Sequence, residues 1–380
     1  MAHRVYVGLS GGVDSAVSAA LLKERGLDVC GVFIKIWRPE FIECTWKEDR
    51  IDAMRVCAAL SIPYHEIDLS EQYKKEVIDG MIREYALGIT PNPDVLCNRF
   101  IKFGAFAAWA RTQGADLIAT GHYARIRQDG AHLELLRGSD PDKDQSYFLC
   151  RLEQHDLART IFPVGGMKKS EVRERASALG LPVAQKRDSQ GLCFVGDVSM
   201  ADFLRRFISL ESGSVIDTEG REIGEHQGAA LYTVGERHGF LITAKSAART
   251  PHYIVRVDTE HNVIVVSPDR SATQSRIATV GDLSWVYRQP ASGSQLHAQA
   301  RYREKPFPVK VHAVRATSVL DVESDEPRVF PPGQSLVLYR DEVCLGGGVI
   351  RKETSMRGQG IDSVALSPRT PVRKIIRKVQ

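Results

Sequence analysis

The stretch Val5-Tyr6-Val7-Gly8-Leu9-Ser10-Gly11-Gly12-Val13-Asp14-Ser15 decides the fold of the first part of the chain. Residues 5–9 form a short apolar run that predicts a buried β-strand, and residues 16–25 have the apolar pattern of a helix. The loop between them therefore presents the unpaired N–H groups of a helix N-terminus, which attract anions. Gly11 and Gly12 let the backbone approach a phosphate without a Cβ in the way.

The rest of the first two hundred residues alternates strand patterns with helical patterns. This alternation predicts an α/β domain with a parallel sheet and helices on both faces. The expected strands are 29–34, 64–68 and 116–119, and the expected helices are 52–60, 73–87 and 101–113. We also expect a β-hairpin, 124–127 with 133–137, and a helix from an N-cap at Ser170 to Gly180. Ligands of such sheets bind beyond the carboxyl ends of the strands, where the loop of residues 10–15 lies.

With 380 residues, the chain is too long for one ordinary core and predicts two or three domains. Beyond about residue 205 it is rich in turns, and from about residue 275 it reads as β throughout. The strands expected there are 253–257 and 263–266 on either side of Asn262, then 299–302, 309–313, 335–339 and 343–350. We expect an α/β domain over residues 1–200, a small mixed central domain over 201–273, a β-barrel-like domain over 274–365 and a basic tail over 366–380.

The composition, 43% hydrophobic and 26% charged, is that of a soluble globular protein. No window approaches the roughly 18 apolar residues of a membrane span and the N-terminus lacks a signal-peptide pattern, so we expect a cytoplasmic protein with no membrane partner. The net charge, 51 − 47 = +4, permits nucleic-acid binding without proving it. The tail carries five cations without an acid among them, and both a solvated tail and a phosphate-contacting tail remain open. These cations are Arg369, Arg373, Lys374, Arg377 and Lys378.

Seven cysteines, at positions 30, 44, 57, 97, 150, 193 and 344, form no Cys-x-x-Cys pair. The odd number and the spacing argue against a disulfide framework and against a structural metal. Cys30 lies in an apolar strand pattern and Cys57 on the apolar face of a helix, so both are expected in the core.

Cys97 and Cys193 lie in different surroundings. Cys97 follows a proline-pinned loop and precedes a helix, where a thiol pKa should be lowered, although an incidental surface cysteine remains an alternative. Asp94, three residues earlier, is close enough to exchange protons with a bound group. Cys193 lies between glycines and after two cations, which suits a mobile loop with a reactive thiol. The two thiols could serve one reaction as donor and resolver, although spacing alone does not show that they meet.

The loop of residues 10–15 suits the pyrophosphate leaving group of ATP, since the hydroxyls of Ser10 and Ser15 add donors to the backbone N–H groups. Asp14 would repel a phosphate, so we expect Mg²⁺ to arrive with ATP and to contact Asp14, rather than to occupy a site made by the protein alone. The string is neither a Walker loop nor a dinucleotide fingerprint. Ser-Gly-Gly-x-Asp-Ser resembles the PP-loop of the ATP pyrophosphatases, which cleave ATP between the α and β phosphates and adenylate a carbonyl or carboxylate oxygen.

Nine segments, in order over nearly the whole chain, carry a more specific resemblance. They are Gly8–Ser15, Thr90–Lys102, Gly121–Tyr123, Lys143–Leu149, Asp188–Phe194, Gly224–Gly228, Arg301–Arg303, Pro332–Ser335 and Cys344–Gly348. Together they resemble the tRNA-specific 2-thiouridylase family. The family usually has Met at the position of Ile34 and Asn at that of Ile36. A backbone contact at Ile34 survives this difference.

The resemblance implies a role for particular residues. Cys193 would carry a persulfide, Cys97 would be the nucleophile, and Asp94 would meet the target base. The ATP site would consist of Gly8, Leu9, Ser10, Gly11, Gly12, Val13, Asp14, Ser15, Gly121 and the backbone of Ile34. Contacts with tRNA would come from Asn92, Pro93, Asp94, His122, Lys143, Asp144, Gln145, Arg301, Tyr302 and Gln334.

The implied activity is ATP-dependent adenylation of the 2-oxo group of the wobble uridine, followed by sulfur transfer to give 2-thiouridine. The partners would be the anticodon region of a tRNA, with its base splayed out, and a sulfur-relay protein or cysteine desulfurase. An amide-forming ATP pyrophosphatase such as an argininosuccinate-type ligase shares the loop but needs neither cysteine. A 4-thiouridine synthetase is disfavoured because only nine residues precede Ser10, and a plain RNA-binding module because Asp94 and both cysteines are present. The sequence does not indicate which tRNAs are used or the oligomeric state.

Overall fold

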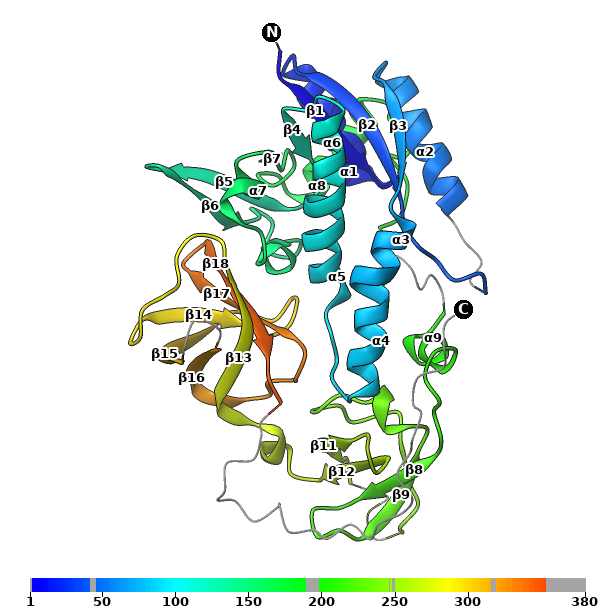
Figure 1. Ribbon diagram of the computed structural model, residues 1–380, viewed down its shortest axis with the longest axis vertical. Helices are drawn as coiled ribbons and strands as arrows, with labels where there is room; N and C mark the ends of the chain where they lie inside the picture. The colour runs from blue at the N-terminus through cyan, green and yellow to red at the C-terminus, as the bar shows by residue number, and fades with distance from the viewer. Residues whose placement is uncertain are drawn as a thin grey trace.

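The computed structural model describes residues 2–41, 46–188, 198–245, 247, 250–315 and 319–352. The chain forms an α/β unit with a parallel sheet, a small β-rich middle unit and a β-barrel (Figure 1). In Figure 1 the parallel sheet lies at one end of the long axis, the middle unit lies at the other end, and the barrel lies beside the long helices. The predicted fold class is confirmed. Over the described ranges, no helix combines the length and the apolar character needed to cross a membrane.

Five parallel strands form the N-terminal sheet, in the order β3-β2-β1-β4-β7. They are β1 (Arg4–Leu9), β2 (Asp28–Lys35), β3 (Tyr64–Asp68), β4 (Leu117–Ala119) and β7 (Thr160–Ile161). The order reverses at β1, since β2 and β3 lie on one side of it and β4 and β7 on the other. The crevice at the carboxyl ends of β1 and β4 is therefore the place where such sheets bind ligands.

Helices cover both faces of this sheet, and the side chains of β1 alternate between two cores. Val5, Val7 and Leu9 are buried on one face, whereas Tyr6 is buried on the other. The first face is covered by α1 (Val13–Glu24), α2 (Trp46–Ala59) and α8 (Lys169–Ala178).

Two long helices, each with a π-helical stretch, cover the second face. The first consists of α3 (Ser70–Tyr73), η1 (Lys74–Ile78) and α4 (Asp79–Ala86), and the second of α5 (Pro93–Leu96), η2 (Cys97–Phe106) and α6 (Ala107–Thr112). The second helix begins at Pro93, so the predicted start at residue 101 is wrong. Proline suits the first helical position, and Asn92 Oδ1 accepts the Val95 N–H at 3.3 Å. Asp94 and Cys97 consequently lie on a helix rather than in a loop, and π turns are frequent at functional sites.

The middle unit is a five-stranded sheet in the order β10-β9-β8-β12-β11. Its strands are β8 (Gly213–Ile216), β9 (Glu222–His226), β10 (Leu241–Ile242), β11 (Tyr253–Asp258) and β12 (Val263–Ser267), and α9 (Met200–Arg205) precedes them. The short helices η4 (Ala229–Leu231) and η5 (Arg270–Thr273) complete this part of the chain. The hairpin predicted beside Asn262 is confirmed, with Asn262 at a φ of +53° between β11 and β12.

Six strands close the barrel in the order β13-β16-β15-β14-β17-β18, because β13 also pairs with β18. They are β13 (Ser275–Trp285), β14 (Gln295–Gln299), β15 (Phe307–Arg315), β16 (Val319–Arg328), β17 (Ser335–Arg340) and β18 (Val343–Ile350). The predicted strand 299–302 is wrong beyond its first residue. The Ala300 N–H donates to Glu304 Oε2 at 3.0 Å instead of to a strand, so Arg301 and Tyr302 lie in the turn that follows β14.

The hairpin β5 (Ala124–Asp129) and β6 (His132–Arg137) belongs to the first two hundred residues but extends the barrel sheet. β6 pairs with β18, and Glu342 accepts Arg125 at 2.6 Å and Arg127 at 3.2 Å. The hairpin itself was predicted and is confirmed; its pairing with the barrel was not foreseen. A hairpin of the first two hundred residues is therefore part of the sheet that forms the barrel, while the parallel sheet stays separate.

The short helices η3 (Ser146–Leu149) and α7 (Gln154–Leu157) lead from this hairpin to α8. The N-cap of α8 is Lys168, so the predicted N-cap at Ser170 is wrong. The Lys168 N–H donates to the carboxylate of Glu171 at 2.6 Å, and the Lys169 N–H donates to Asp140 Oδ2 at 2.8 Å. These two bonds satisfy backbone groups that a helix start leaves unpaired.

Gly165 and Gly166 form a matched pair that tests the close packing of the hairpin against the α/β unit. A Cβ at Gly165 would lie 1.6 Å from the carbonyl oxygen of Ala124, whereas a Cβ at Gly166 would have nothing within 4 Å. We expect Gly165→Ala to lower the free energy of unfolding by about 1–3 kcal/mol, as overpacking does, and Gly166→Ala to leave it nearly unchanged. Denaturant unfolding measures both, and equal stabilities would contradict the packing described.

Candidate active site

The loop after β1 leaves the N-terminus of α1 open to a ligand. Gly12 is the extended N-cap of α1, and none of the described side chains caps the first N–H groups. Gly11 has a φ of +73°, and a Cβ there would lie 2.4 Å from the carbonyl oxygen of Asp49, so only glycine fits. Ser15 Oγ accepts the Ser10 N–H at 3.3 Å and donates to the Gly12 carbonyl at 3.2 Å. The result is a fixed loop with the features of an anion-binding helix N-terminus.

Three neighbouring strands end around this loop. Gly8 of β1 lies against Ile34 of β2, since a Cβ at Gly8 would be 3.6 Å from Ile34 Cδ1. Gly121 follows β4, and a Cβ there would be 2.7 Å from the nitrogen of Ser15. The structure therefore brings together the segment Gly8–Ser15, Ile34 and Gly121, the residues expected to form the ATP site.

Asp14 is paired with a lysine from a distant part of the chain. Asp14 Oδ1 accepts the Tyr123 hydroxyl at 2.8 Å and the Lys169 ammonium at 2.7 Å. The charge of Asp14 is therefore already opposed by Lys169, and the predicted contact of Asp14 with Mg²⁺ stays a prediction. The described residues contain no group of three or more His, Cys, Asp and Glu that could hold a metal. A Mg²⁺ ion here would have to take most of its oxygen ligands from a nucleotide and from water.

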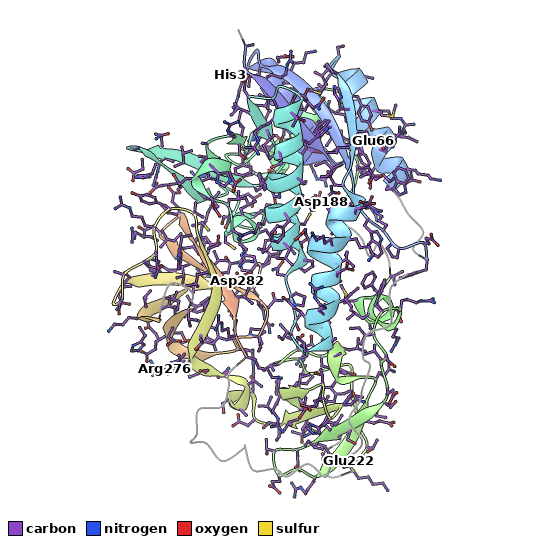
Figure 2. The ribbon with its side chains drawn as sticks, in the orientation of Figure 1. His3, Glu66, Asp188, Glu222, Arg276 and Asp282 are labelled. Carbon is purple, nitrogen blue, oxygen red and sulfur yellow. The ribbon has the colours of Figure 1, made fainter. Side chains whose placement is uncertain are left out.

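Asp188 is the second partner of Lys169. It accepts Lys143 at 2.7 Å, Arg173 at 2.7 Å and Lys169 at 2.9 Å. Burial opposes its ionisation, yet the bonds from Lys143 and Lys169 lower the pKa of Asp188 to about 2. In Figure 2, Asp188 lies near the end of the parallel sheet that is nearer to the other two units. The chain enters residues 189–197 from Asp188; Cys193 belongs to that segment and lies outside the described residues.

The segment Lys143–Gln145, predicted to contact tRNA, makes bonds inside the protein. Asp144 Oδ1 accepts the Ser146 N–H, and Gln145 Oε1 accepts the Tyr123 N–H, each at 3.0 Å. This segment therefore positions Tyr123, the residue that bonds Asp14. Its contact with tRNA stays a prediction.

Asp94 and Cys97 lie about one turn apart on the helix that Asn92 caps, and both are half-buried. Burial raises the pKa of Asp94, and the positive charge of Lys102 opposes this shift. A carboxyl group with a raised pKa accepts and holds a proton closer to neutral pH than an ordinary aspartate does.

The other described cysteines differ from Cys97 in burial. Burial raises the pKa of the Cys30 thiol to about 11 and those of Cys57 and Cys150 to about 12, and it raises the pKa of Cys344 well above its usual value. All four are buried, which confirms the expectation for Cys30 and Cys57. Among the cysteines that the structure describes, Cys97 is the one within partial reach of solvent.

His122 links the end of β4 to the Asp94 helix. His122 is 7% exposed, and its ring packs against those of Phe103 and Phe162, with centroid distances of 5.8 and 6.0 Å. Burial and the nearby Lys102 lower its pKa well below the usual value, so the ring is neutral. Lys102 Nζ lies 3.5 Å from Nε2 and Thr120 Oγ1 lies 2.8 Å from Nδ1. Because an ammonium only donates, Nε2 accepts and Nδ1 carries the proton.

The barrel and the middle unit both hold the backbone just before α5. Gln334 Nε2 donates to the carbonyl oxygens of Thr90 and Pro91, at 2.9 and 3.3 Å. The Thr90 N–H donates to the Pro332 carbonyl at 3.1 Å, and Thr90 Oγ1 lies 2.8 Å from Thr233 Oγ1. Both units therefore help to fix the position of the helix that carries Asp94 and Cys97.

Arg301 and Tyr302 lie on the barrel beside η3. The Tyr302 ring is half-buried with its centroid 4.4 Å from that of Phe148, and Arg303 lies over it at 5.4 Å; Arg301 is exposed. Aromatic rings and arginines of this kind suit contacts with nucleotides. The proposed tRNA role of both residues stays a prediction.

Comparison with known proteins gives the family. Three family models match in order: a tRNA methyl transferase HUP domain over residues 3–197, a tRNA methyl transferase PRC-barrel domain over 201–268 and an aminomethyltransferase beta-barrel domain over 275–350. The tRNA-specific 2-thiouridylase MnmA of Ralstonia pickettii is 43% identical over 353 residues, which cover 91% of this chain and 95% of that protein. The chain belongs to the tRNA-specific 2-thiouridylase family. Its members are sulfurtransferases, and the resemblance drawn from the nine segments is confirmed.

Other 2-thiouridylases match equally well. The protein of Cupriavidus taiwanensis is 43% identical over 358 residues, covering 92% of this chain and 99% of that protein. The protein of Leptothrix cholodnii is 46% identical over 368 residues, covering 92% and 96%. The similarity therefore includes all three structural units.

Four residues of this candidate site were not selected from the sequence: Lys102, Tyr123, Lys169 and Thr233. Lys102 and Tyr123 fall inside segments that carry the family resemblance, so that signal could have found them. Lys169 and Thr233 have no local signal, because their partners Asp14 and Thr90 lie 155 and 143 residues away.

The raised pKa of Asp94 predicts how its replacement changes stability. Between the unfolded and the folded pKa of Asp94, the native state binds more protons than the unfolded state, so stability falls as pH rises through that window. We expect Asp94→Asn to be more stable than wild type at pH 8 and to lose this advantage as pH falls towards 4. Urea unfolding across this range measures the difference.

Asp68 provides a control of opposite sign. The hydrogen bond from Lys35, at 2.6 Å, is the main cause that lowers the pKa of Asp68 to about 2. The stability that ionised Asp68 contributes is present above the unfolded pKa and is lost as pH falls through the folded pKa. Asp68→Asn should therefore reduce stability at pH 8. If Asp94→Asn also reduced stability at pH 8, the conclusion that burial destabilises the ionised form of Asp94 would be wrong.

Proposed function

We propose that the protein replaces the 2-oxo oxygen of the wobble uridine of tRNA with sulfur, consuming ATP and releasing AMP and pyrophosphate. The observation that carries the proposal is the match to tRNA-specific 2-thiouridylases over 91% of the chain. The loop at the end of β1 and the Asp94 helix support it, because both meet the segment after β4: Gly121 lies against Ser15, and His122 contacts Lys102. No observation on the described residues favours the amide-forming alternative.

In the first step, the uridine O2 attacks the α-phosphorus of ATP and the bond to the bridging oxygen of the β-phosphate breaks. Pyrophosphate leaves with the bonding electrons towards the N–H groups at the start of α1. Asp94 accepts the proton from the uridine N3 as O2 bonds to phosphorus. The raised pKa of Asp94 supports this role. Mg²⁺ would accompany ATP and offset phosphate charge, and Asp14 would be the carboxylate of the loop that could hold it.

In the second step, the terminal sulfur of a Cys193 persulfide attacks C2 of the base, and AMP leaves with the electrons of the C–O bond. The Cys97 thiolate then attacks Sγ of Cys193 and the bond between the two persulfide sulfurs breaks. The base leaves as 2-thiouridine when N3 takes back the proton that Asp94 holds. Cys97 and Cys193 end as a disulfide that a reductant must reopen. The half-buried position of Cys97, one turn from Asp94, supports this role.

Binding of tRNA would involve surfaces of more than one unit. Arg301 and Tyr302 would contact the anticodon region, with Lys143, Asp144 and Gln145 at the junction between barrel and α/β unit. Asn92 and Pro93 would lie beside the target base, while His122 and Gln334 would act mainly by holding the neighbouring backbone and side chains. A sulfur-relay protein or cysteine desulfurase would load Cys193, and we expect this chemistry in the cytoplasm.

The order of the two steps can be tested with a Cys97→Ser, Cys193→Ser double variant. Activation of the oxygen needs the loop and the base but no thiol, so the variant should release about one pyrophosphate per bound tRNA and make no 2-thiouridine. Pyrophosphate release and mass spectrometry of tRNA nucleosides measure the two outcomes. Gly11→Ala is the matched negative control, because its Cβ would collide with Asp49 and distort the loop. Absence of pyrophosphate from a double variant that binds ATP and tRNA would exclude this order.

The division of labour between the two thiols gives a second test. We expect Cys193→Ser to accept no sulfur from a ³⁵S-loaded desulfurase relay, and Cys97→Ser to retain label without turnover. Cys57→Ser, a change in the core, serves as the control that loads and turns over. Wild-type labelling of Cys193→Ser would reverse the assigned roles.

A further inference from the structure

Lys169 is the first residue of α8, and its side chain reaches the loop at the end of β1. Its Nζ lies 2.7 Å from Asp14 Oδ1 and 2.9 Å from Asp188 Oδ1, and the side chain is 12% exposed. The bond from its backbone N–H to Asp140 holds the start of the side chain in place. A lysine is therefore fixed beside the first turn of α1, in the crevice between β1 and β4.

The loop itself contains no lysine. Phosphate loops of the Walker type place a lysine directly after their glycines, where it reaches the β and γ phosphates. In this chain Val13, Asp14 and Ser15 follow Gly12, so the loop supplies backbone N–H groups and hydroxyls but no cation. The tertiary structure brings a cation to the same place from a residue 155 positions later.

The partners of Lys169 are arranged so that its ammonium can leave them. Asp188 keeps Lys143 and Arg173 at 2.7 Å each, and Asp14 keeps the Tyr123 hydroxyl at 2.8 Å. Moving Nζ therefore leaves neither carboxylate without a hydrogen bond, and Asp188 also keeps two cations.

The charges around Lys169 also permit an anion to enter. Lys143, Lys169 and Arg173 form ion pairs with two carboxylates, those of Asp14 and Asp188, so this cluster has one more positive than negative charge. A triphosphate consequently meets no net repulsion from this cluster. It does meet one ammonium that can turn towards it.

We propose that Lys169 is a phosphate-binding residue: its ammonium moves from Asp14 to the pyrophosphate part of ATP and stabilises the negative charge that collects there as pyrophosphate leaves. The inference rests on the proposed use of ATP. It assigns to α8 the role that a lysine within the loop has in Walker-type proteins. No bond other than those of the adenylation step forms or breaks.

Calorimetric binding of pyrophosphate and of AMP, at a fixed Mg²⁺ concentration, tests the proposal. We expect Lys169→Met to weaken pyrophosphate binding about tenfold or more, as loss of a charge-assisted hydrogen bond does, and to leave AMP binding within about twofold. Lys169→Arg should retain most of the affinity. Lys168→Met, which removes the exposed neighbouring cation, should bind both probes as wild type does. Unchanged pyrophosphate affinity in folded Lys169→Met overturns the proposal.

A double variant separates direct binding from simple neutralisation of Asp14. If Lys169 only offsets Asp14, removing both charges in Asp14→Asn, Lys169→Met should restore pyrophosphate affinity, and the proposal fails. If Lys169 binds phosphate itself, the double variant should stay weak. A merely structural role would lower the melting temperature and weaken AMP and pyrophosphate equally, which also overturns it.

The proposed function fails on a different observation. If the wild-type protein releases no pyrophosphate from ATP in the presence of tRNA, the adenylation reaction is wrong, whatever the binding data show. If wild type releases pyrophosphate but Lys169→Met binds and releases it equally well, only the inference about Lys169 fails.

Discussion

The backbone contact at Gly121 is the constraint on which the rest of the site depends. A Cβ there would lie 2.7 Å from the nitrogen of Ser15, so glycine alone lets the end of β4 lie against the first turn of α1. The residues that follow then take their places: His122 reaches Lys102, and the Tyr123 hydroxyl reaches Asp14. One close approach therefore joins the loop, the Asp94 helix and the charged cluster in the crevice where the strand order reverses.

Asp94 and Cys97 are placed by contacts from outside their own unit. Gln334 of the barrel and Thr233 of the middle unit both bond Thr90, directly before the helix that carries the two residues. The hairpin β5–β6 adds a second connection, because it continues the barrel sheet into the α/β unit. This arrangement would suit the proposed reaction on tRNA, since short hydrogen bonds couple the barrel, where Arg301 and Tyr302 are predicted to contact tRNA, to the backbone before the helix of Asp94 and Cys97.

Several residues expected to contact tRNA have their polar groups engaged within the protein. Asp144 and Gln145 accept backbone N–H groups, and Gln334 donates to backbone carbonyls. Their side chains hold the site in shape, and a buried polar group of this kind is costly to leave without its partner. Burial also raises the pKa of Asp94, so the carboxylate form of the group proposed for proton transfer is destabilised by its surroundings.

The sequence by itself determined the parallel sheet, the loop of residues 10–15 and the family, because short stretches of consecutive residues carry the signal for each. The strand and helix periods around residues 5–25 and the nine ordered segments need no knowledge of distant contacts. Local sequence signals gave the wrong helix start where a capping bond decided it. Pro93 and the bond from Val95 N–H to Asn92 start the helix at residue 93, eight residues before the apolar pattern that predicted its start. Only the tertiary structure decided the partners of Asp14, the pairing of β6 with β18 and the bonds from Gln334 to the backbone before α5. Each of these contacts joins residues more than a hundred positions apart. The local periodicity of a sequence does not indicate which distant strands and side chains will meet.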